Sequence, residues 1–440
     1  MLAALQQIVG EDHTMAPAPH DAIDGVLPAF VIRPGNVGEL SAVLQAVRAA
    51  RAAVVVRGAG TKLGWGQPPD SLPAIVDMTR FNRVLEHAAG DLVVRAEAGV
   101  RLQDLQRTLA TAGQRLALDP PHDGTLGGIV ASNASGPRRL RFGTCRDLLI
   151  GITVVLADGT VAKAGGKVVK NVAGYDLAKL FTGSFGTLGA IAEVIFRLHP
   201  QPADRSIVIA DVPTLGEAAE GVQVLMHSSL VPSAIELRGA GPEAGTVGGE
   251  ARQKAGTTAS NELEDPSVLS GFSLAALFEG VTAGVIAQAD KAAALLRPHG
   301  RVTVAHGADA DVLWAPYAAE PFADATVGLK LSVVPTDVAS ACAAVFDLAR
   351  SRSIGASIQA HAASGIVYAA FEGAHSHDHA HVIAELRRRG PVAVLKSPAA
   401  MKRVVPVWPD AGDAYQLMQR VKRQFDADRV MAPGRFMSGI

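Results

Sequence analysis

The chain has 440 residues, a formal net charge of -1 at pH 7, 48% apolar residues and 19% charged residues. This length exceeds what a single hydrophobic core usually organises, so about two to three domains are expected. The apolar content excludes a chain that is disordered throughout, and the near-neutral charge gives no field that attracts nucleic acid or an anionic membrane. The two cysteines, Cys145 and Cys342, cannot hold an iron–sulfur cluster, a four-cysteine zinc site or a disulfide framework. Redox chemistry in this chain therefore requires an organic cofactor or a partner.

No apolar run approaches the roughly 20 residues that a bilayer span needs. Residues 1–10 also lack the basic lead and the continuous apolar stretch of a targeting segment. We therefore expect a soluble cytoplasmic protein.

Short strands and helices alternate in residues 1–204, as the spacing of apolar residues indicates. We expect helices at 37–50 and 102–109, strands at 52–56, 74–77 and 189–199, and a hairpin of 150–157 with 160–164 around an Asp-Gly turn.

Residues 205–397 contain an internal repeat, in which strands and helices follow the order β-α-β-β-α-β twice. The first copy is expected to have strands at 206–212, 233–237, 272–279 and 302–306 and helices at 215–226 and 281–296. The second is expected to have strands at 327–334, 356–360, 366–371 and 392–396 and helices at 338–350 and 382–389. Two such units side by side predict one antiparallel sheet with helices on one face. The stretch 239–266 is expected to be a mobile surface loop, and residues 398–440 a third segment with a helix at 414–425.

A glycine-rich loop follows the strand at 52–56. Gly58 and Gly60, with Asp77 roughly 20 residues further on, match parts of the Rossmann dinucleotide-binding fingerprint. The intervening residues 64–69, Gly-Trp-Gly-Gln-Pro-Pro, cannot form the crossover helix whose N-terminus would bind the pyrophosphate, so we reject this interpretation. The small residues from Gly58 to Thr61 instead allow successive backbone N–H groups to point into one concavity that binds an anion.

Two further glycine-rich loops predict close contact between the backbone and a bulky ligand. In the first, Gly127 and Gly128 are followed by small residues as far as Ser132. The basic residues after this loop either neutralise a diphosphate or form a solvated face; they are Arg138, Arg139 and Arg141. In the second, residues 183–191 offer strand-edge amides to a planar heterocycle. A phosphate-loop lysine pattern and a Gly-x-Ser-x-Gly nucleophile elbow are both missing from the sequence, so nucleotide hydrolysis and triad hydrolysis have no support.

In chain order, these motifs resemble the FAD-binding domain of the vanillyl-alcohol-oxidase (PCMH-type) family. The residues that carry the resemblance are Arg57–Thr61, Thr125–Gly128 with Asn133, Arg141–Asp147, Lys170–Leu177, Gly183–Gly189 and the tail Phe425–Phe436. The resemblance spans nearly the whole chain. It is strongest to the FAD-binding E-type subunits of bacterial glycolate oxidases, which are related to flavin-dependent D-2-hydroxy-acid dehydrogenases.

The resemblance implies an α+β fold with three parts. These are a two-subdomain FAD-binding domain at 1–204, an α+β cap domain at 205–397 built from the two repeats, and a segment at 398–440 that returns to the FAD domain. The resemblance also implies an FAD site. Its expected residues are Arg57, Gly58, Ala59, Gly60, Thr61, Lys62, Thr125, Gly127, Gly128, Ser132, Asn133, Arg141, Gly143, Asp147, Gly189, Ile191 and Arg435.

The resemblance further implies that FAD is bound non-covalently. Many family members attach FAD through a histidine in the first loop, where this chain has Thr61. Cys145 is an alternative tether, but we interpret it as a small, half-buried thiol.

The candidate substrate residues depart from the family's catalytic pattern. Relatives that oxidise D-2-hydroxy acids carry a His-x-x-Asp-Gly-Asn-x-His stretch and later a Glu-His pair. This chain has His361, Ser364, Ile366 and Tyr368 at the first motif and residues 401–408 in place of the second. One imidazole cannot hold zinc, so no metal site is expected.

Three side chains remain candidates for substrate chemistry. His361 is either a satisfied strand residue near the flavin or an acid–base group, and Tyr368 is a second candidate base. Lys330 either meets a substrate carboxylate or is an exposed charge, and the same alternatives apply to Lys396.

A group of four histidines follows at His375, His377, His379 and His381. Their spacing of two places them on one face only of an extended strand, whereas Asp378 and the residues at 382–386 indicate a helix start. We therefore expect a surface loop that binds metal adventitiously.

The function that the resemblance implies is that of an FAD-binding subunit of a heteromeric glycolate (2-hydroxy acid) oxidase in glycolate catabolism. Its implied partners are a homologous catalytic flavoprotein subunit and an iron–sulfur subunit that receives the electrons. Such a complex implies that the chain reaches the inner face of the membrane only through its partners. Two alternatives remain open: a self-sufficient FAD-dependent 2-hydroxy-acid dehydrogenase, and an assembly protein that has kept the fold without catalysis.

Overall fold

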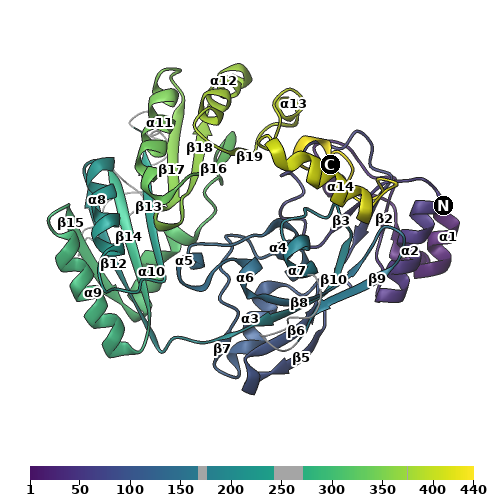
Figure 1. Ribbon diagram of the computed structural model, residues 1–440, viewed down its shortest axis with the longest axis horizontal. Helices are drawn as coiled ribbons and strands as arrows, with labels where there is room; N and C mark the ends of the chain where they lie inside the picture. The colour runs from purple at the N-terminus through teal and green to yellow at the C-terminus, as the bar shows by residue number, and fades with distance from the viewer. Residues whose placement is uncertain (167–175, 242–270, 374) are drawn as a thin grey trace, which may run out of the picture. The chain divides into compact units, whose positions relative to one another are not determined.

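The computed structural model describes residues 1–166, 176–241, 271–373 and 375–440. Contacts divide the chain into two compact units (Figure 1). The first contains Met1–Gly136, Phe142–Gln201 and Lys402–Ile440, and the second contains Pro137–Arg141 and Pro202–Met401. The motif expected at 170–175 and most of the loop expected at 239–266 lie outside the described residues. The short segment 137–141 packs with the second unit although the chain on both sides of it belongs to the first.

The first unit begins with a four-stranded sheet in the order β1-β2-β4-β3. Its elements are α1 (Leu2–Val9), β1 (Thr14–Met15), β2 (Phe30–Ile32), α2 (Val37–Ala49), β3 (Val54–Arg57) and β4 (Ala74–Asp77). The helix α2 begins after Asn36, whose side-chain oxygen accepts the N–H of Glu39 at 2.9 Å, and its apolar stripe is buried. Because β3 and β4 are parallel and in register, Arg57 and Asp77 lie side by side where both strands end.

The second part of this unit is an antiparallel sheet of five strands in the order β5-β6-β10-β8-β9. Its elements are β5 (Val84–Ala88), β6 (Val93–Glu97), α3 (Leu102–Ala110), β7 (Gln114–Arg115), α4 (Leu126–Ser132), α5 (Arg139–Phe142), α6 (Cys145–Leu148), β8 (Leu149–Val155), β9 (Val161–Gly165), α7 (Leu177–Phe181), β10 (Ala190–Arg197) and β11 (His199–Pro200). The expected hairpin is the pair β8 and β9. Cys145 lies in the core of this part, fully rather than half buried.

The C-terminal part of the first unit, Lys402–Ile440, begins at the last residue of α13 (Ala399–Lys402) and contains α14 (Tyr415–Phe425). After α14 the chain runs beside β3, where the Val54 N–H donates to the carbonyl of Val430 at 2.8 Å and the Ala432 N–H donates to the carbonyl of Val54 at 2.8 Å. The buried amine of Lys422 donates to the carbonyls of Thr187 (2.7 Å) and Met431 (2.8 Å). These bonds fix the tail beside the loop that follows β3.

The second unit is built on one antiparallel sheet of eight strands in the order β15-β12-β14-β13-β17-β18-β16-β19. Its elements are β12 (Asp204–Val212), α8 (Leu215–Met226), β13 (Ala234–Ala240), β14 (Phe272–Gly280), α9 (Thr282–Leu296), β15 (Arg301–His306), α10 (Gly307–Ala318), β16 (Val327–Ser332), α11 (Val338–Arg350), β17 (Gly355–His361), β18 (Ile366–Glu372), α12 (Ser376–Arg387) and β19 (Val392–Lys396). Each half is the expected β-α-β-β-α-β unit, and the halves join where β13 pairs with β17. The predicted α+β fold with two repeats is confirmed.

The sequence predicted that the helices of the second unit all lie on one face of the sheet, but in the structure they lie on both faces. Side chains alternate along a strand, and α8 packs near Leu274, on the face opposite Ala275 and Leu277. The connecting helix α10 packs on the Ala275 and Leu277 face through Trp314 and Tyr317. The expectation was wrong at α10 because this helix, with Pro316 inside it, belongs to neither repeat and joins the two.

Candidate cofactor site

The first unit contains a cavity of about 840 Å³, counted with its open mouth. A concave, mostly apolar lining with a few polar groups is typical of sites for organic ligands. The loops that line it follow β3, precede and begin α4, and precede β10, and the tail after α14 completes it. Most of the residues expected to bind a cofactor line it: Arg57, Gly58, Ala59, Gly60, Thr61, Lys62, Thr125, Gly127, Gly128, Ser132, Gly189, Ile191 and Arg435.

The glycines of the first two loops allow the loops to approach each other closely. A Cβ at Gly58 would lie 1.9 Å from Oγ1 of Thr125, and a Cβ at Gly127 would lie 2.8 Å from Cβ of Ala98. Real Cβ atoms do not tolerate such distances, so each position requires glycine. Oγ1 of Thr125 is buried and has no hydrogen-bond partner among the residues that the structure describes. A buried hydroxyl of this kind at a cavity wall suits a ligand with polar atoms.

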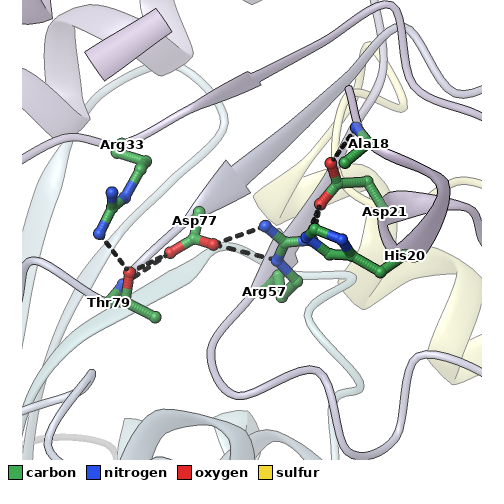
Figure 2. Close-up of polar contacts among 7 residues, drawn as sticks. All are labelled: Ala18, His20, Asp21, Arg33, Arg57, Asp77 and Thr79. Carbon is green, nitrogen blue, oxygen red and sulfur yellow. Dashed lines mark hydrogen bonds and ion pairs between the residues drawn. The ribbon is translucent and has the colours of Figure 1, made fainter. Parts of the chain in front are cut away.

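Arg57 begins the first loop but is already neutralised, as Figure 2 shows. Its Nε and Nη2 donate to Oδ2 of Asp77 at 3.0 and 2.7 Å, and its Nη1 donates to Asp21. Burial opposes the charged form of Arg57, but the hydrogen bonds to the two carboxylates outweigh burial and raise its pKa. Asp77 also accepts from the N–H (2.9 Å) and hydroxyl (2.5 Å) of Thr79. Arg57 therefore shapes the loop, and Asp77 is occupied within the protein rather than placed as a ribose ligand.

The guanidinium group of Arg435 is a second positive charge in the wall of the cavity. Its side chain is 1% exposed and donates to the carbonyl of Leu63 in the first loop. Burial lowers its pKa to about 10, so it remains charged at neutral pH. Its Nε has no hydrogen-bond partner within the described part of the chain. The residue can therefore donate a further hydrogen bond to a ligand.

Phe185 lines the cavity and was missed in the sequence analysis. Its ring packs edge-on against Trp408 at 5.3 Å and lies 5.8 Å from the guanidinium carbon of Arg435. The backbone of Phe185 has φ +56, a value that favours glycine. The sequence does offer a signal, an aromatic residue between the two glycines Gly183 and Gly186. In the structure both glycines have positive φ.

The remaining residues expected at the cofactor site do not line the cavity. Asn133 ends α4 in the left-handed conformation. Asp147 accepts the N–H and hydroxyl of Thr144 at 2.7 and 2.8 Å, beside Gly143. Arg141 belongs to the second unit, where its Nη1 donates to the backbone carbonyl of Glu279 at 2.5 Å.

The other arginines of that basic run also belong to the second unit. Arg138 pairs with the buried carboxylate of Glu279 at 3.1 Å. The positive charge of Arg139 contributes to lowering the pKa of Lys330 in the second unit.

The three candidate substrate residues lie together on the second unit's sheet. Tyr368 on β18 is the register partner of Lys330 on β16, and the rings of His361 and Tyr368 are 5.4 Å apart. Burial, with the charge of Arg139, lowers the pKa of Lys330 to about 8. Lys330 has no hydrogen bond or ion pair to any residue in the described ranges. Lys396, in contrast, donates to two backbone carbonyls of the segment before β16, at 2.7 and 2.9 Å.

The histidines at 375–381 do not form a surface loop, which corrects the expectation. They lie at the start of α12, which begins six residues before the predicted helix, at Ser376. His379 is 2% exposed and packs against Phe371, and burial lowers its pKa. The loop prediction failed because the helix was expected from 382 onward, whereas it begins at Ser376 and includes His377, His379 and His381 in its first turns. Among the described residues there is no group of three or more His, Cys, Asp or Glu that could hold a metal ion.

Comparison with known proteins identifies the class of the first unit. Residues 28–165 match the FAD binding domain family. Over 99% of its length the chain superimposes on p-cresol methylhydroxylase with substrate bound, covering 95% of that chain with a TM-score of 0.73 and 14% identity. The matched domain and the glycine-lined cavity define an FAD-binding domain, and FAD is its cofactor. The superposition shows that the fold is of the vanillyl-alcohol-oxidase (PCMH) type.

Two curated relatives each match part of the chain. Glycolate oxidase subunit GlcD of Bacillus subtilis is 35% identical over 213 residues, which are 48% of this chain and 45% of that protein. Glycolate oxidase subunit GlcE of Escherichia coli is 36% identical over 152 residues, 34% of this chain and 43% of that protein. The matched region thus spans less than half the length of these relatives. In the described ranges, no helix combines the length and apolar character needed to cross a bilayer.

Proposed function

We propose that this chain is the FAD-binding subunit of a heteromeric glycolate (2-hydroxy acid) oxidase. The observation that carries the proposal is the cavity of the first unit, in which three glycine-rich loops and the C-terminal tail converge. Support comes from the similarity to two glycolate oxidase subunits. Both cysteines are buried and unable to hold a cluster, so electrons would pass onward to an iron–sulfur partner subunit. In this proposal the chain works in the cytoplasm, at the membrane's inner face only through its partners.

The residues of the cavity fit the cofactor. The backbones of Gly58, Gly60 and Gly127 would approach the diphosphate and the rings, Oγ1 of Thr125 would bond a polar atom, and Arg435 would supply positive charge. Backbone N–H groups near Gly189 and Ile191 would stabilise negative charge on the ring system. When bound, FAD supplies an acceptor for two electrons and a hydrogen from the substrate. We expect non-covalent binding.

A second function, oxidation by this chain alone, is favoured by the polar side chains on the second unit's sheet. Lys330 would hold the carboxylate of a 2-hydroxy acid, since its amine has no partner among the described residues and is charged below pH about 8. His361 or Tyr368 would accept the hydroxyl proton. In this second proposal the cluster would supply the groups that hold the substrate and accept its proton.

Purification of the chain and titration with its substrates test these functions. We expect a yellow protein that releases FAD on acid treatment. Anaerobic bleaching of the isolated chain by glycolate or D-lactate would support self-sufficient oxidation, whereas bleaching only after addition of the partner subunits would support the subunit function. A colourless protein that does not bind added FAD would overturn both proposed functions and leave the alternative of an assembly protein without catalysis.

A further inference from the structure

The first glycine-rich loop of the cofactor cavity has little regular structure of its own. Residues 58–73, all of which the structure describes, contain no helix or strand. Within the loop, the N–H of Leu63 donates to the carbonyl of Gly60 at 3.2 Å, and the N–H of Trp65 donates to the carbonyl of Lys62 at 3.1 Å. Isolated turn bonds of this kind leave a segment that opens easily. The position of the loop therefore depends on its contacts with other parts of the first unit.

Arg435 joins the loop to the C-terminal part of the first unit. Its Nη2 donates to the carbonyl of Leu63, and its own carbonyl accepts the N–H of Gln67 at 3.2 Å. A Cβ at Gly66 would lie 2.7 Å from that carbonyl oxygen, so the two backbones are in direct contact. The same carbonyl accepts a hydrogen bond from Nε1 of Trp408 at 2.9 Å. Arg435 thus connects the loop to Trp408.

Residues 402–408, which we call the strap, also hold the loop at their other end. Lys402 is 2% exposed, and its amine donates to the carbonyl of Gly64 and, at 2.7 Å, to Oδ1 of Asp24. A buried ammonium group requires such partners. Neither Lys402 nor Trp408 lines the cavity. Both ends of the strap therefore hold the loop in place without contributing to the cavity wall.

The other two glycine-rich loops are fixed to regular elements instead. The N–H of Gly127 donates to the carbonyl of Ala98, just after β6, at 2.7 Å, and the N–H of Phe185 donates to the carbonyl of Ala131 on α4 at 2.8 Å. Moving either loop breaks bonds to the core of the first unit, whereas moving the first loop breaks its contacts with Arg435 and the strap. The first loop is therefore the part of the wall that opens at the lowest free energy.

We propose that the strap is the gate of the cofactor cavity, so that FAD enters and leaves when the contacts between residues 402–408 and the first loop are broken. Lys402 and Trp408 are positioning residues that act on the cofactor through the loop. The inference depends on FAD binding by the first unit and is independent of the substrate and of any partner subunit.

A gate and a wall differ in their kinetics. The strap bonds to protein atoms, and these bonds are available with and without the cofactor. Weakening them stabilises the open state equally in both forms, so FAD should associate and dissociate faster by the same factor while its affinity stays the same. Weakening a wall that holds the cofactor would instead raise the dissociation rate alone and lower the affinity.

Two variants weaken the strap, and a third serves as the matched control. Trp408→Phe removes the indole N–H and keeps an aromatic ring. Lys402→Met combined with Asp24→Asn removes both charges of the buried pair, so that neither charge is left without its partner. The control Tyr415→Phe removes the hydrogen bond from Oη of Tyr415 to the carbonyl of Ser438 at 3.2 Å, which lies in the same C-terminal part of the unit and involves neither the loop nor the strap.

The test uses the full chain and measures both directions of exchange. Stopped-flow mixing of flavin-free protein with FAD gives the association rate from flavin fluorescence. A chase of holoprotein carrying isotopically labelled FAD with excess unlabelled FAD gives the dissociation rate. We expect both rates to rise about fivefold in Trp408→Phe and about tenfold or more in the double variant, with an affinity within about twofold of the wild type. We expect Tyr415→Phe to match the wild type.

Hydrogen exchange provides a readout that does not involve the cofactor. In flavin-free protein, exchange in peptides that cover residues 63–67 should speed up by about the same factors in the two strap variants, because the N–H of Gln67 is bonded to Arg435 only while the gate is closed. Exchange in these peptides should be unchanged in Tyr415→Phe.

Three results would overturn the inference. Wild-type association and dissociation rates in both strap variants would show that the strap does not limit exchange. A faster dissociation with an unchanged association rate would make Lys402 and Trp408 supports of the wall rather than parts of a gate. Equal changes in Tyr415→Phe would reflect general loosening of the C-terminal part. If the double variant does not fold, Trp408→Phe decides by the same criteria.

Discussion

The close approach of two glycine-rich loops makes Gly58→Ala the sharpest test of the cofactor site. The added methyl would lie 1.9 Å from Oγ1 and 3.0 Å from Cβ of Thr125. Threonine is branched at Cβ, and its Cγ2 also lies 3.1 Å from the added methyl, so rotation about χ1 does not relieve the clash. The two loops must therefore separate, which shifts both walls of the cavity.

The size of the effect follows from the cost of overpacking. Forcing an extra methyl into a packed site costs about 1–3 kcal/mol. Since each 1.4 kcal/mol is a factor of ten in affinity, the variant should bind FAD about 5- to 150-fold more weakly if the displaced loops are those that hold it. We would measure this by titrating the flavin-free protein with FAD and following flavin fluorescence.

Gly64→Ala is the matched control, because it lies in the same loop and does not line the cavity. The nearest atom to a Cβ there is Nζ of Lys402 at 3.8 Å, an ordinary contact. We expect its affinity for FAD to match the wild type, and Gly58→Ala combined with Thr125→Ala to regain part of the lost affinity. If Gly58→Ala bound FAD with an affinity within twofold of the wild type, the inference that these two loops bind the cofactor would be refuted.

Three further predictions follow from buried polar groups. Lys422→Met leaves Asp426 buried without its cation and should lower the free energy of unfolding in urea by about 3–5 kcal/mol; a loss below about 1 kcal/mol would contradict the role given to this lysine. The second proposed function requires Lys330 to hold the substrate carboxylate; because burial lowers the pKa of this lysine to about 8, the affinity for glycolate, measured by titration calorimetry, should then fall as the pH rises through this value. Lys330→Met should bind glycolate about tenfold or more weakly at pH 7 and lose this pH dependence; a retained dependence would exclude Lys330 as its source. Burial raises the thiol pKa of both Cys145 and Cys342, the latter to about 12, so neither should react with a thiol reagent faster than the protein unfolds; rapid labelling of the folded protein would show that these thiols are accessible.

The elements of the second unit could be predicted closely because each strand and helix carries a strong local pattern. The helices at 215–226 and 338–350 have the predicted bounds. The helix α10 was missed because its apolar residues do not follow helical spacing and Pro316 lies within it. Its place on the sheet is decided by Trp314 and Tyr317, which pack on strands about 40 to 110 residues earlier in the chain.

The glycine-rich loops allowed the cofactor site to be predicted from the sequence. The roles of the charged residues could not be predicted, because they depend on hydrogen bonds to residues far away in the sequence. Arg57 is neutralised by Asp21, a partner 36 residues away that no local pattern connects to it. Glu236 meets His361 only through strand pairing across 125 residues. A family motif therefore identifies the imidazole in the sequence, whereas no local pattern points to the carboxylate that is hydrogen-bonded to it.

The position of Arg435 has a consequence for how the protein acquires its cofactor in the cell. Translation proceeds from the N-terminus, and Ala432 and Arg435 supply part of the cavity wall. The three glycine-rich loops therefore leave the ribosome long before the wall is complete. Stable flavin loading must await the synthesis of residues 432–435, and a premature stop codon shortly before residue 435 would yield a product with an open, poorly retentive pocket.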